Sequence, residues 1–229
     1  MSVALRLQLS LGAFDLDVDL RSDAPIIAFI GPNGSGKSTA LRCVVGAHPQ
    51  ACGRVVLGGR TLMDSAAGLH LSPADRRIGY LPQRDALFEH LTAVDNVAFG
   101  LRGDRATAQR LLEEAGLGAL AEQRPPELSG GQRQHVASLR AMAWGPDSLI
   151  LDEPTAALDW VARDHARKRL RAYAAAQGLP VLLATHDPTE LAAFAPHVVV
   201  LEAGRIIAQG TVEQLSSQPP NAFVAAFLG

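Results

Sequence analysis

Apolar and polar positions alternate at the start of the chain, from Val3 to Leu11 and again from Phe14 to Leu20. This period of two is typical of strands with one buried face, and the intervening Gly12-Ala13 predicts a hairpin. Residues 26–30 form a continuous apolar run, which predicts a strand buried on both faces. Similar runs recur at residues 149–151, 181–184 and 198–201.

Helical patterns fill much of the chain between these runs. A helix is expected from Lys37 to about Ala47, and residues 84–144 have a predominantly helical pattern. A second hairpin is expected around Gly58-Gly59, and a short apolar helix around residues 223–228.

The order of these segments predicts an α/β fold with a mostly parallel core sheet, an N-terminal antiparallel β-lobe and an inserted helical lobe. Residues 1–229 are expected to form a single domain. Within it, residues 1–83 and 145–229 are assigned to the core with its β-lobe, and residues 84–144 to the helical lobe.

Charge and apolar content narrow the classes of function. A formal net charge of −2 argues against a protein that binds nucleic acid by neutralising its phosphates. No apolar run reaches the roughly 18 residues that a membrane-spanning helix needs. The alternating residues 1–11 do not fit a secretory signal peptide. We therefore expect a protein that reaches a membrane only through partners.

The segment GPNGSGKST follows the apolar run 26–30 and precedes a predicted helix. It satisfies GxxxxGK[ST], the phosphate-binding P-loop of nucleotide hydrolases, and it has the strand before and the helix after it that this motif requires. Lys37 is expected to reach the β- and γ-phosphates of ATP, and the Ser38 hydroxyl to bind Mg²⁺. The residues predicted to bind nucleotide here are Gly31, Asn33, Gly34, Ser35, Gly36, Lys37, Ser38 and Thr39.

Ionisable side chains follow two further apolar runs. Asp152 and Glu153 come directly after residues 149–151, and His186 closes the run that begins at residue 181. Ligands of open parallel sheets bind at the carboxyl ends of the strands, which favours a functional role over solvated strand ends. Asp152 is a candidate Mg²⁺ ligand, Glu153 a candidate base for the attacking water, and His186 a candidate sensor of the γ-phosphate.

The pentapeptide LSGGQ at residues 128–132 precedes another predicted helix, with Ser129 as its expected N-cap. Two glycines expose the amides of the first turn, which makes this helix start a second candidate anion site. LSGGQ ends twenty residues before Asp152 in a chain with a P-loop. With these motifs the sequence resembles the ATP-binding cassette (ABC) ATPases along nearly its whole length.

The resemblance implies a head-to-tail dimer in which each ATP lies between one subunit's P-loop and the other's LSGGQ. Gln83, in GYLPQ, looks like the family's glutamine that links Mg²⁺ and water to the helical lobe, and Asp159 looks like the aspartate that crosses the dimer interface. Glu153 would be the general base and His186 the switch histidine. The residues implied to contact the nucleotide of a second subunit are Ser129, Gly130, Gly131, Gln132 and Asp159.

Three features of the sequence are ambiguous or depart from the family pattern. Relatives stack an aromatic ring from the N-terminal hairpin on the adenine, and Phe14 fits this role and core packing equally well. His135 stands where many relatives carry arginine, so the local charge contacts differ. A basic stretch is expected to be a solvated helix face, and it comprises Arg163, Arg167, Lys168, Arg169 and Arg171.

The segment 81–101 resembles the part of bacterial importer ATPases that receives helices from the membrane subunits, and LSPADRRIGYLPQ is similar to molybdate importers in particular. This implies ATP hydrolysis that powers import of a small solute such as an oxyanion, at the cytoplasmic face of the cell membrane. The implied partners are integral-membrane permease subunits, a second ATPase subunit and a solute-binding protein, with no nucleic acid. An exporter, a lipoprotein-releasing complex and a non-transport ABC ATPase are the alternatives.

Overall fold

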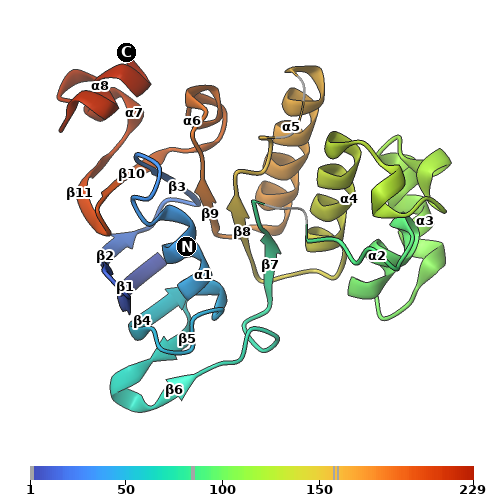
Figure 1. The fold of residues 1–229 in the computed structure, drawn as a ribbon, viewed down its shortest axis with the longest axis horizontal. Helices are drawn as coiled ribbons and strands as arrows, with labels where there is room; N and C mark the ends of the chain where they lie inside the picture. The colour runs from blue at the N-terminus through green and yellow to red at the C-terminus, as the bar shows by residue number, and fades with distance from the viewer. Residues whose placement is uncertain (1–2, 84–85, 157, 159) are drawn as a thin grey trace.

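The computed structural model describes residues 3–83, 86–156, 158 and 160–229. Across these residues, one sheet contains strands in the order β6-β5-β4-β1-β2-β11-β10-β3-β9-β8-β7 (Figure 1). The strands are β1 (Val3–Leu11), β2 (Phe14–Ser22), β3 (Ile26–Ile30), β4 (Cys52–Leu57), β5 (Arg60–Asp64), β6 (Leu69–His70), β7 (Ile78–Leu81), β8 (Ser148–Asp152), β9 (Val181–Ala184), β10 (His197–Glu202) and β11 (Arg205–Gly210).

The part of the sheet from β10 to β7 is parallel. β3 lies between β10 and β9, and β8 lies between β9 and β7. Every residue of β3, β8 and β9 is buried, which confirms the strands predicted from their apolar runs. Because parallel strands end at the same edge of a sheet, the segments that follow β3, β7, β8 and β9 come together there.

The other part of the sheet is mainly antiparallel. β1 pairs with β2 through the predicted hairpin, and Leu7 lies opposite Val18. β1 also pairs with β4, and β4 with β5 through the second predicted hairpin. The mixed sheet therefore confirms the predicted fold class, a parallel core with an antiparallel β-lobe.

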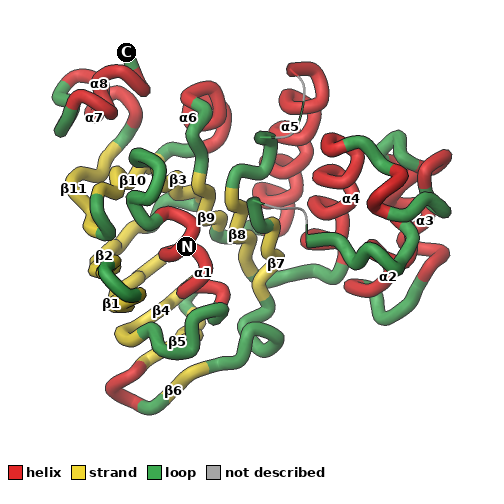
Figure 2. Tube along the Cα trace, in the orientation of Figure 1, coloured by secondary structure: helices red, strands yellow, loops and turns green. Residues whose placement is uncertain are grey.

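Helices cover both faces of the parallel strands (Figure 2). The α-helices are α1 (Lys37–Val45), α2 (Ala93–Gly100), α3 (Arg105–Glu114), α4 (Gly130–Ala143), α5 (Trp160–Gln177), α6 (Pro188–Phe194), α7 (Val212–Ser217) and α8 (Ala222–Leu228). In Figure 1, α2, α3 and α4 gather at one side of the molecule, and α7 and α8 lie at the other. Among the described helices, none is long and apolar enough to cross a bilayer.

Buried apolar residues form two clusters, one on each face of the parallel strands. Ala28 and Ile30 point into the cluster that includes residues of α2, α4 and α5. Ile27 and Phe29 point into the other, which includes residues of α1, β1 and β2. Both faces of β3 are covered, and this strand therefore lacks polar positions.

Helix α1 is two residues shorter than expected. It ends at Val45 because Gly46 adopts the left-handed conformation, with φ of 90°, and its N–H bonds to the carbonyls of Arg42 and Cys43. The pattern of apolar residues could not locate this stop, since a glycine C-cap is a matter of backbone conformation. The short strand β7 and the half-exposed strand β11 were likewise not predicted from local alternation.

Arg76 ties the end of α1 to the chain before β7. It is 4% exposed, and its guanidinium donates to the carbonyls of Cys43 at 3.0 Å, Val44 at 2.6 Å and Leu71 at 3.0 Å. We expect Arg76→Ala to lower the free energy of unfolding by about 3 kcal/mol, because two buried carbonyls and one partly buried carbonyl lose a charged donor. Urea denaturation measures this.

The matched control is Arg54→Ala. The Arg54 side chain is 61% exposed and makes a surface ion pair with Asp64. Its effect is expected to stay within about 0.5 kcal/mol. Equal effects of the two substitutions would contradict a special role for Arg76.

Candidate functional site

The glycine-rich loop between β3 and α1 depends on residues without a Cβ. Gly31 has φ of 151°, and a Cβ there would lie 2.1 Å from the carbonyl oxygen of Leu201. Gly36 has φ of 105°, and a Cβ there would lie 2.8 Å from the ring of Phe14. Glycine is thus the residue that fits both the backbone conformation and the space, and it leaves the loop amides close to the start of α1.

Lys37 is the first residue of α1 and bends back over this loop. Its side chain is buried, and Nζ donates to the carbonyls of Gly31 at 2.8 Å and Pro32 at 3.0 Å. Burial lowers the pKa of Lys37, while the charges of Glu153 and Asp152 oppose this change. The loop therefore fixes an ammonium group at the P-loop, where it can attract an anion.

A cavity of about 400 Å³ opens in front of the loop. Its lining brings together the N-terminal hairpin, the loop, the start of α1 and two strand ends, and comprises Phe14, Asn33, Gly34, Gly36, Lys37, Ser38, Thr39, Gln83 and Glu153. Gly31 and Ser35 are not in the lining. The Ser35 side chain is 3% exposed, so any contact of this residue with a ligand would come from its backbone.

Phe14 occupies a position that is compatible with both roles expected for it. Its ring lines the cavity, and it also packs against the buried cluster of β1, β2 and α1.

Asp152 ends β8 directly behind the start of α1. It is 1% exposed, and its Oδ1 accepts a hydrogen bond from the Ser38 hydroxyl at 2.9 Å. Within the described residues, Oδ2 is buried without a hydrogen-bond partner. Burial raises the pKa of Asp152, and the neighbouring charge of Glu153 adds to that rise. A buried carboxylate oxygen without a donor, next to a hydroxyl, fits a divalent cation such as Mg²⁺.

Glu153 follows Asp152 and is contacted from two sides. Gln83, two residues after β7, donates its Nε2 to Oε2 at 3.0 Å. His186, two residues after β9, places Nδ1 3.2 Å from Oε1. The structure thus brings together three site residues that the sequence predicted from separate motifs.

The backbone of Glu153 has an unusual conformation, with φ of 54°. A non-glycine residue in the left-handed region costs of order 1–3 kcal/mol and needs support from its surroundings. The Glu153 N–H donates to the carbonyl of Ala184 at 2.9 Å, and its carbonyl accepts from Gln134 Nε2 at 3.1 Å. Gln134, 2% exposed on α4, was missed because a glutamine two residues after LSGGQ shows no distinguishing pattern.

The LSGGQ residues begin α4 as expected. Ser129 is the N-cap, and a reciprocal pair of hydrogen bonds links it to Gln132. Ser129, Gly131 and Gln132 line a separate cavity of about 440 Å³, which shares no lining residue with the P-loop cavity. Within this one chain, LSGGQ and the P-loop therefore do not form a common site. Asp159 lies outside the described residues.

The basic stretch on α5 is only in part the solvated face that we expected, because Lys168 and Arg171 are exposed but the other three arginines are not. Arg163 and Arg167 both bind the carboxylate of Asp187, at 2.9 Å and 2.6 Å, and Arg167 is only 7% exposed. Asp187 follows His186 and caps α6, so these arginines brace the segment that carries His186. The prediction was wrong for Arg163 and Arg167 because their acidic partner comes from a distant part of the sequence.

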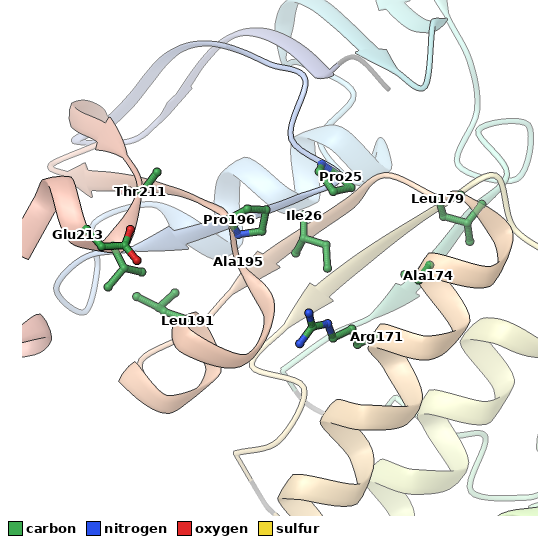
Figure 3. Close-up of a pocket in the computed structure, with 13 residues that line it drawn as sticks. Pro25, Ile26, Arg171, Ala174, Leu179, Leu191, Ala195, Pro196, Thr211 and Glu213 are labelled. Atoms are coloured by element: carbon green, nitrogen blue, oxygen red, sulfur yellow. The ribbon is translucent and has the colours of Figure 1, made fainter.

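A larger cavity, of about 800 Å³, lies at the opposite ends of the parallel strands (Figure 3). Pro25 and Ile26 at the start of β3 line it, together with Leu179 just before β9. The P-loop and His186 follow the other ends of the same two strands. The volume of a cavity therefore does not identify the candidate site in this chain. The positions of the ionisable groups favour the P-loop cavity instead.

The model of one protein family, described as ABC transporter, matches residues 15–156, more than half of the chain. The match begins within the N-terminal hairpin and includes the P-loop, LSGGQ and the acids that end β8. This chain belongs to the ABC transporter family.

Two curated relatives are named as import ATP-binding proteins. The molybdenum import ATP-binding protein ModC of Mycobacterium tuberculosis is 42% identical over 226 residues, which cover 93% of this chain and 61% of that protein. The Fe(3+) ions import ATP-binding protein FbpC of Mesorhizobium japonicum is also 42% identical, over 96% of this chain and 61% of its own length. The chain thus spans about three fifths of these relatives.

A solved structure supports the ABC fold. The ATP-binding cassette MJ0796, in a dimeric post-hydrolysis state bound to ADP and Pi, superposes with a TM-score of 0.76 at 25% identity. The match covers 92% of this chain and 98% of that one.

Proposed function

We propose that this chain is the ATP-hydrolysing subunit of an ABC importer. The observation that carries the proposal is the position of the Glu153 carboxylate, at the P-loop cavity and between Gln83 and His186. A carboxylate held in this way can accept a proton from a water beside the γ-phosphate of ATP.

The other residues of the cavity bind and orient the substrate in this proposal. Lys37 and the loop amides hold the β- and γ-phosphates. Ser38 and Asp152 would hold Mg²⁺, with Gln83 as a further ligand, and a cation there would supply positive charge next to the phosphate oxygens. His186, two residues after β9, contacts the base directly and would approach the γ-phosphate from that side.

The proposal includes a head-to-tail dimer, most simply of two identical chains. Each ATP would lie between the P-loop of one subunit and Ser129, Gly130, Gly131 and Gln132 of the other, with Asp159 at the interface. The separation of the two cavities in one chain supports this, because neither offers both sets of contacts. The dimeric state of the similar cassette supports it further.

We propose that residues 84–144 act as a helical lobe that receives the permease subunits. On α2, Phe99 is 63% exposed, and its ring lies 4.7 Å from that of Phe88. The guanidinium of Arg140 lies 5.2 Å from the Phe88 ring centre. An exposed aromatic ring that packs on a half-buried one beside a cation is suited to bind a short helix of a membrane partner.

The transported solute is proposed to be an oxyanion such as molybdate, delivered by a solute-binding protein, with the chain at the cytoplasmic face of the cell membrane. The support is the import function in the names of the relatives and the LSPADRRIGYLPQ phrase. An exporter, a lipoprotein-releasing complex or a non-transport ATPase would use the same catalytic residues.

A pull-down of the tagged chain from membranes tests the assignment to transport. Recovery of an integral-membrane partner with a solute-binding protein is the expected result. Recovery of only ribosomal or DNA-associated proteins would leave the proposed ATPase activity unaffected but would contradict the importer assignment.

We expect Phe99→Glu to reduce coupled transport at least tenfold while ATP affinity stays within about twofold of wild type, because a buried charge at an interface costs several kcal/mol and the P-loop cavity is untouched. Transport into reconstituted vesicles and ATP binding to the isolated subunit measure the two quantities. Substitutions from Leu87 to Leu91 are expected to act in the same way.

Ile207→Glu is the matched control for this prediction. Ile207 is also an exposed apolar residue, 40% exposed, but it lies on β11. Loss of ATP binding in Phe99→Glu, or equal loss of transport in the control, would contradict the docking role.

A further inference from the structure

The cavity beside the LSGGQ segment has an uncommon set of ionisable residues. It lies between α4 and α5, has a volume of about 440 Å³, and contains His135, His165 and Arg169 in its lining. No carboxylate is among the described residues that line it. The remaining lining is apolar or belongs to the start of α4, so Arg169 is the one cationic side chain among the described residues that border the cavity apart from the two histidines.

Arg169 is the only half-buried arginine of the basic stretch that pairs with no carboxylate, as far as the described residues show. Its Nη1 contacts Nε2 of His135, whereas Arg163 and Arg167 on the same helix both bind Asp187. Glu114 lines the neighbouring cavity that Arg169 also borders, but the two side chains form no ion pair. Burial lowers the pKa of Arg169, and no acidic group opposes that change.

His135 cannot balance the charge of Arg169. Burial lowers the pKa of His135 to about 4, and the charges of Arg169 and His165 contribute to the same direction. At neutral pH the imidazole of His135 is therefore uncharged, and it accepts a hydrogen bond from the guanidinium. Half-buried charges are ordinarily compensated by a counter-charge. Among the described residues none supplies one for Arg169, and its guanidinium is uncompensated there.

His165 and the start of α4 add to the same environment. His165 lies one turn before Arg169 on α5, exposed at the edge of the cavity. The hydroxyl of Ser129 and the amide end of α4 border the cavity from the other side. The planar guanidinium matches two oxygens of a phosphate-type anion, and an imidazole is a second donor for it.

We infer that this cavity is a second binding site, for a phosphate-type oxyanion, with Arg169 as its principal ligand and His165 as a supporting donor. The anion links α4 to α5 and occupies the approach to LSGGQ. A bound anion at this position repels the nucleotide phosphates of the second subunit and slows ATP hydrolysis. This effect on hydrolysis rests on the proposed head-to-tail dimer.

Titration with inorganic phosphate, followed by the imidazole NMR signals of His135 and His165, tests the site directly. Ionic strength is held constant with chloride, and the two signals are assigned with His135→Gln and His165→Gln. Because these signals report on this cavity, phosphate bound at the P-loop does not imitate the effect. We expect saturable shifts of both signals in the wild-type chain.

Arg169→Gln is expected to raise the dissociation constant for phosphate roughly tenfold or more, since a charge-assisted hydrogen bond is lost. Lys168→Gln is the matched control, with the same change of charge on the neighbouring residue of α5, and its effect is expected to stay below about twofold. Lys168 is 76% exposed and pairs with Asp164. If Arg169→Gln does not fold, Arg169→Lys replaces it, with a smaller but measurable weakening because the planar fork is lost.

The absence of a saturable shift in the wild-type chain would overturn the inference, as would equal affinity in the Arg169 variant and the Lys168 control. The ATPase assay separates the inference from the proposed function. If phosphate binds beside His135 and His165 but does not inhibit ATP hydrolysis, the binding site is supported and its proposed effect on the dimer is contradicted.

Discussion

Glu153→Gln is expected to lower the rate of ATP hydrolysis by about a thousandfold while ATP binding is preserved. The amide keeps the size of the side chain and its place between Gln83 and His186, but it cannot accept a proton from water. ATP would then hold the two subunits together without being consumed. Phosphate release measures turnover, and light scattering after gel filtration with ATP detects the trapped dimer.

The control for this substitution is Glu113→Gln. Glu113 lies exposed on α3, where its carboxylate accepts a hydrogen bond from Gln109, and it is remote from the cavity lining. Its turnover is expected to equal that of the wild-type chain. Normal hydrolysis by Glu153→Gln would contradict the role of Glu153 as the base. If neither Glu153→Gln nor Glu113→Gln formed a dimer with ATP, the head-to-tail arrangement would be contradicted.

Lys37→Ala is expected to weaken ATP binding by roughly 100-fold, which corresponds to about 2.7 kcal/mol. The loss combines the charge at the phosphates with the order of the loop, because Nζ also holds the carbonyls of Gly31 and Pro32. Calorimetric titration with ATP measures the affinity, and circular dichroism shows that the fold is retained.

The chain offers a clear control for Lys37, since it has only one other lysine, Lys168. Lys168→Ala removes the same side chain from an exposed position on α5. Its ATP affinity is expected to stay within about twofold of the wild-type value. An unchanged affinity in Lys37→Ala would contradict the assignment of the P-loop.

The local features of the fold were predicted well because each depends on a few neighbouring residues. The apolar runs identified β3, β8 and β9, the alternation identified the hairpin of β1 and β2, and LSGGQ identified the start of α4 with Ser129 as its cap. The end of α1 and the surroundings of α5 were not predicted. Both depend on conformations or partners that a local pattern does not contain.

Arg169 shows that the role of a residue in a basic stretch depends on its tertiary contacts. In the sequence it is one of five basic residues on one helix, and nothing distinguishes it from Arg167. In the structure Arg167 binds Asp187, while Arg169 meets the uncharged His135. The departure at His135 was visible in the sequence, but its partner was not.

The sequence by itself determined that this chain has a P-loop, an LSGGQ segment and acids at the end of a buried strand, because those signals lie in short motifs and in hydrophobic period. Only the tertiary structure decided that Gln83 and His186 meet at Glu153, and that Glu153 adopts a left-handed backbone conformation. The physical reason is that such contacts follow from the order and register of β7, β8 and β9. Burial across the whole sheet sets that order, and no local stretch of sequence encodes it.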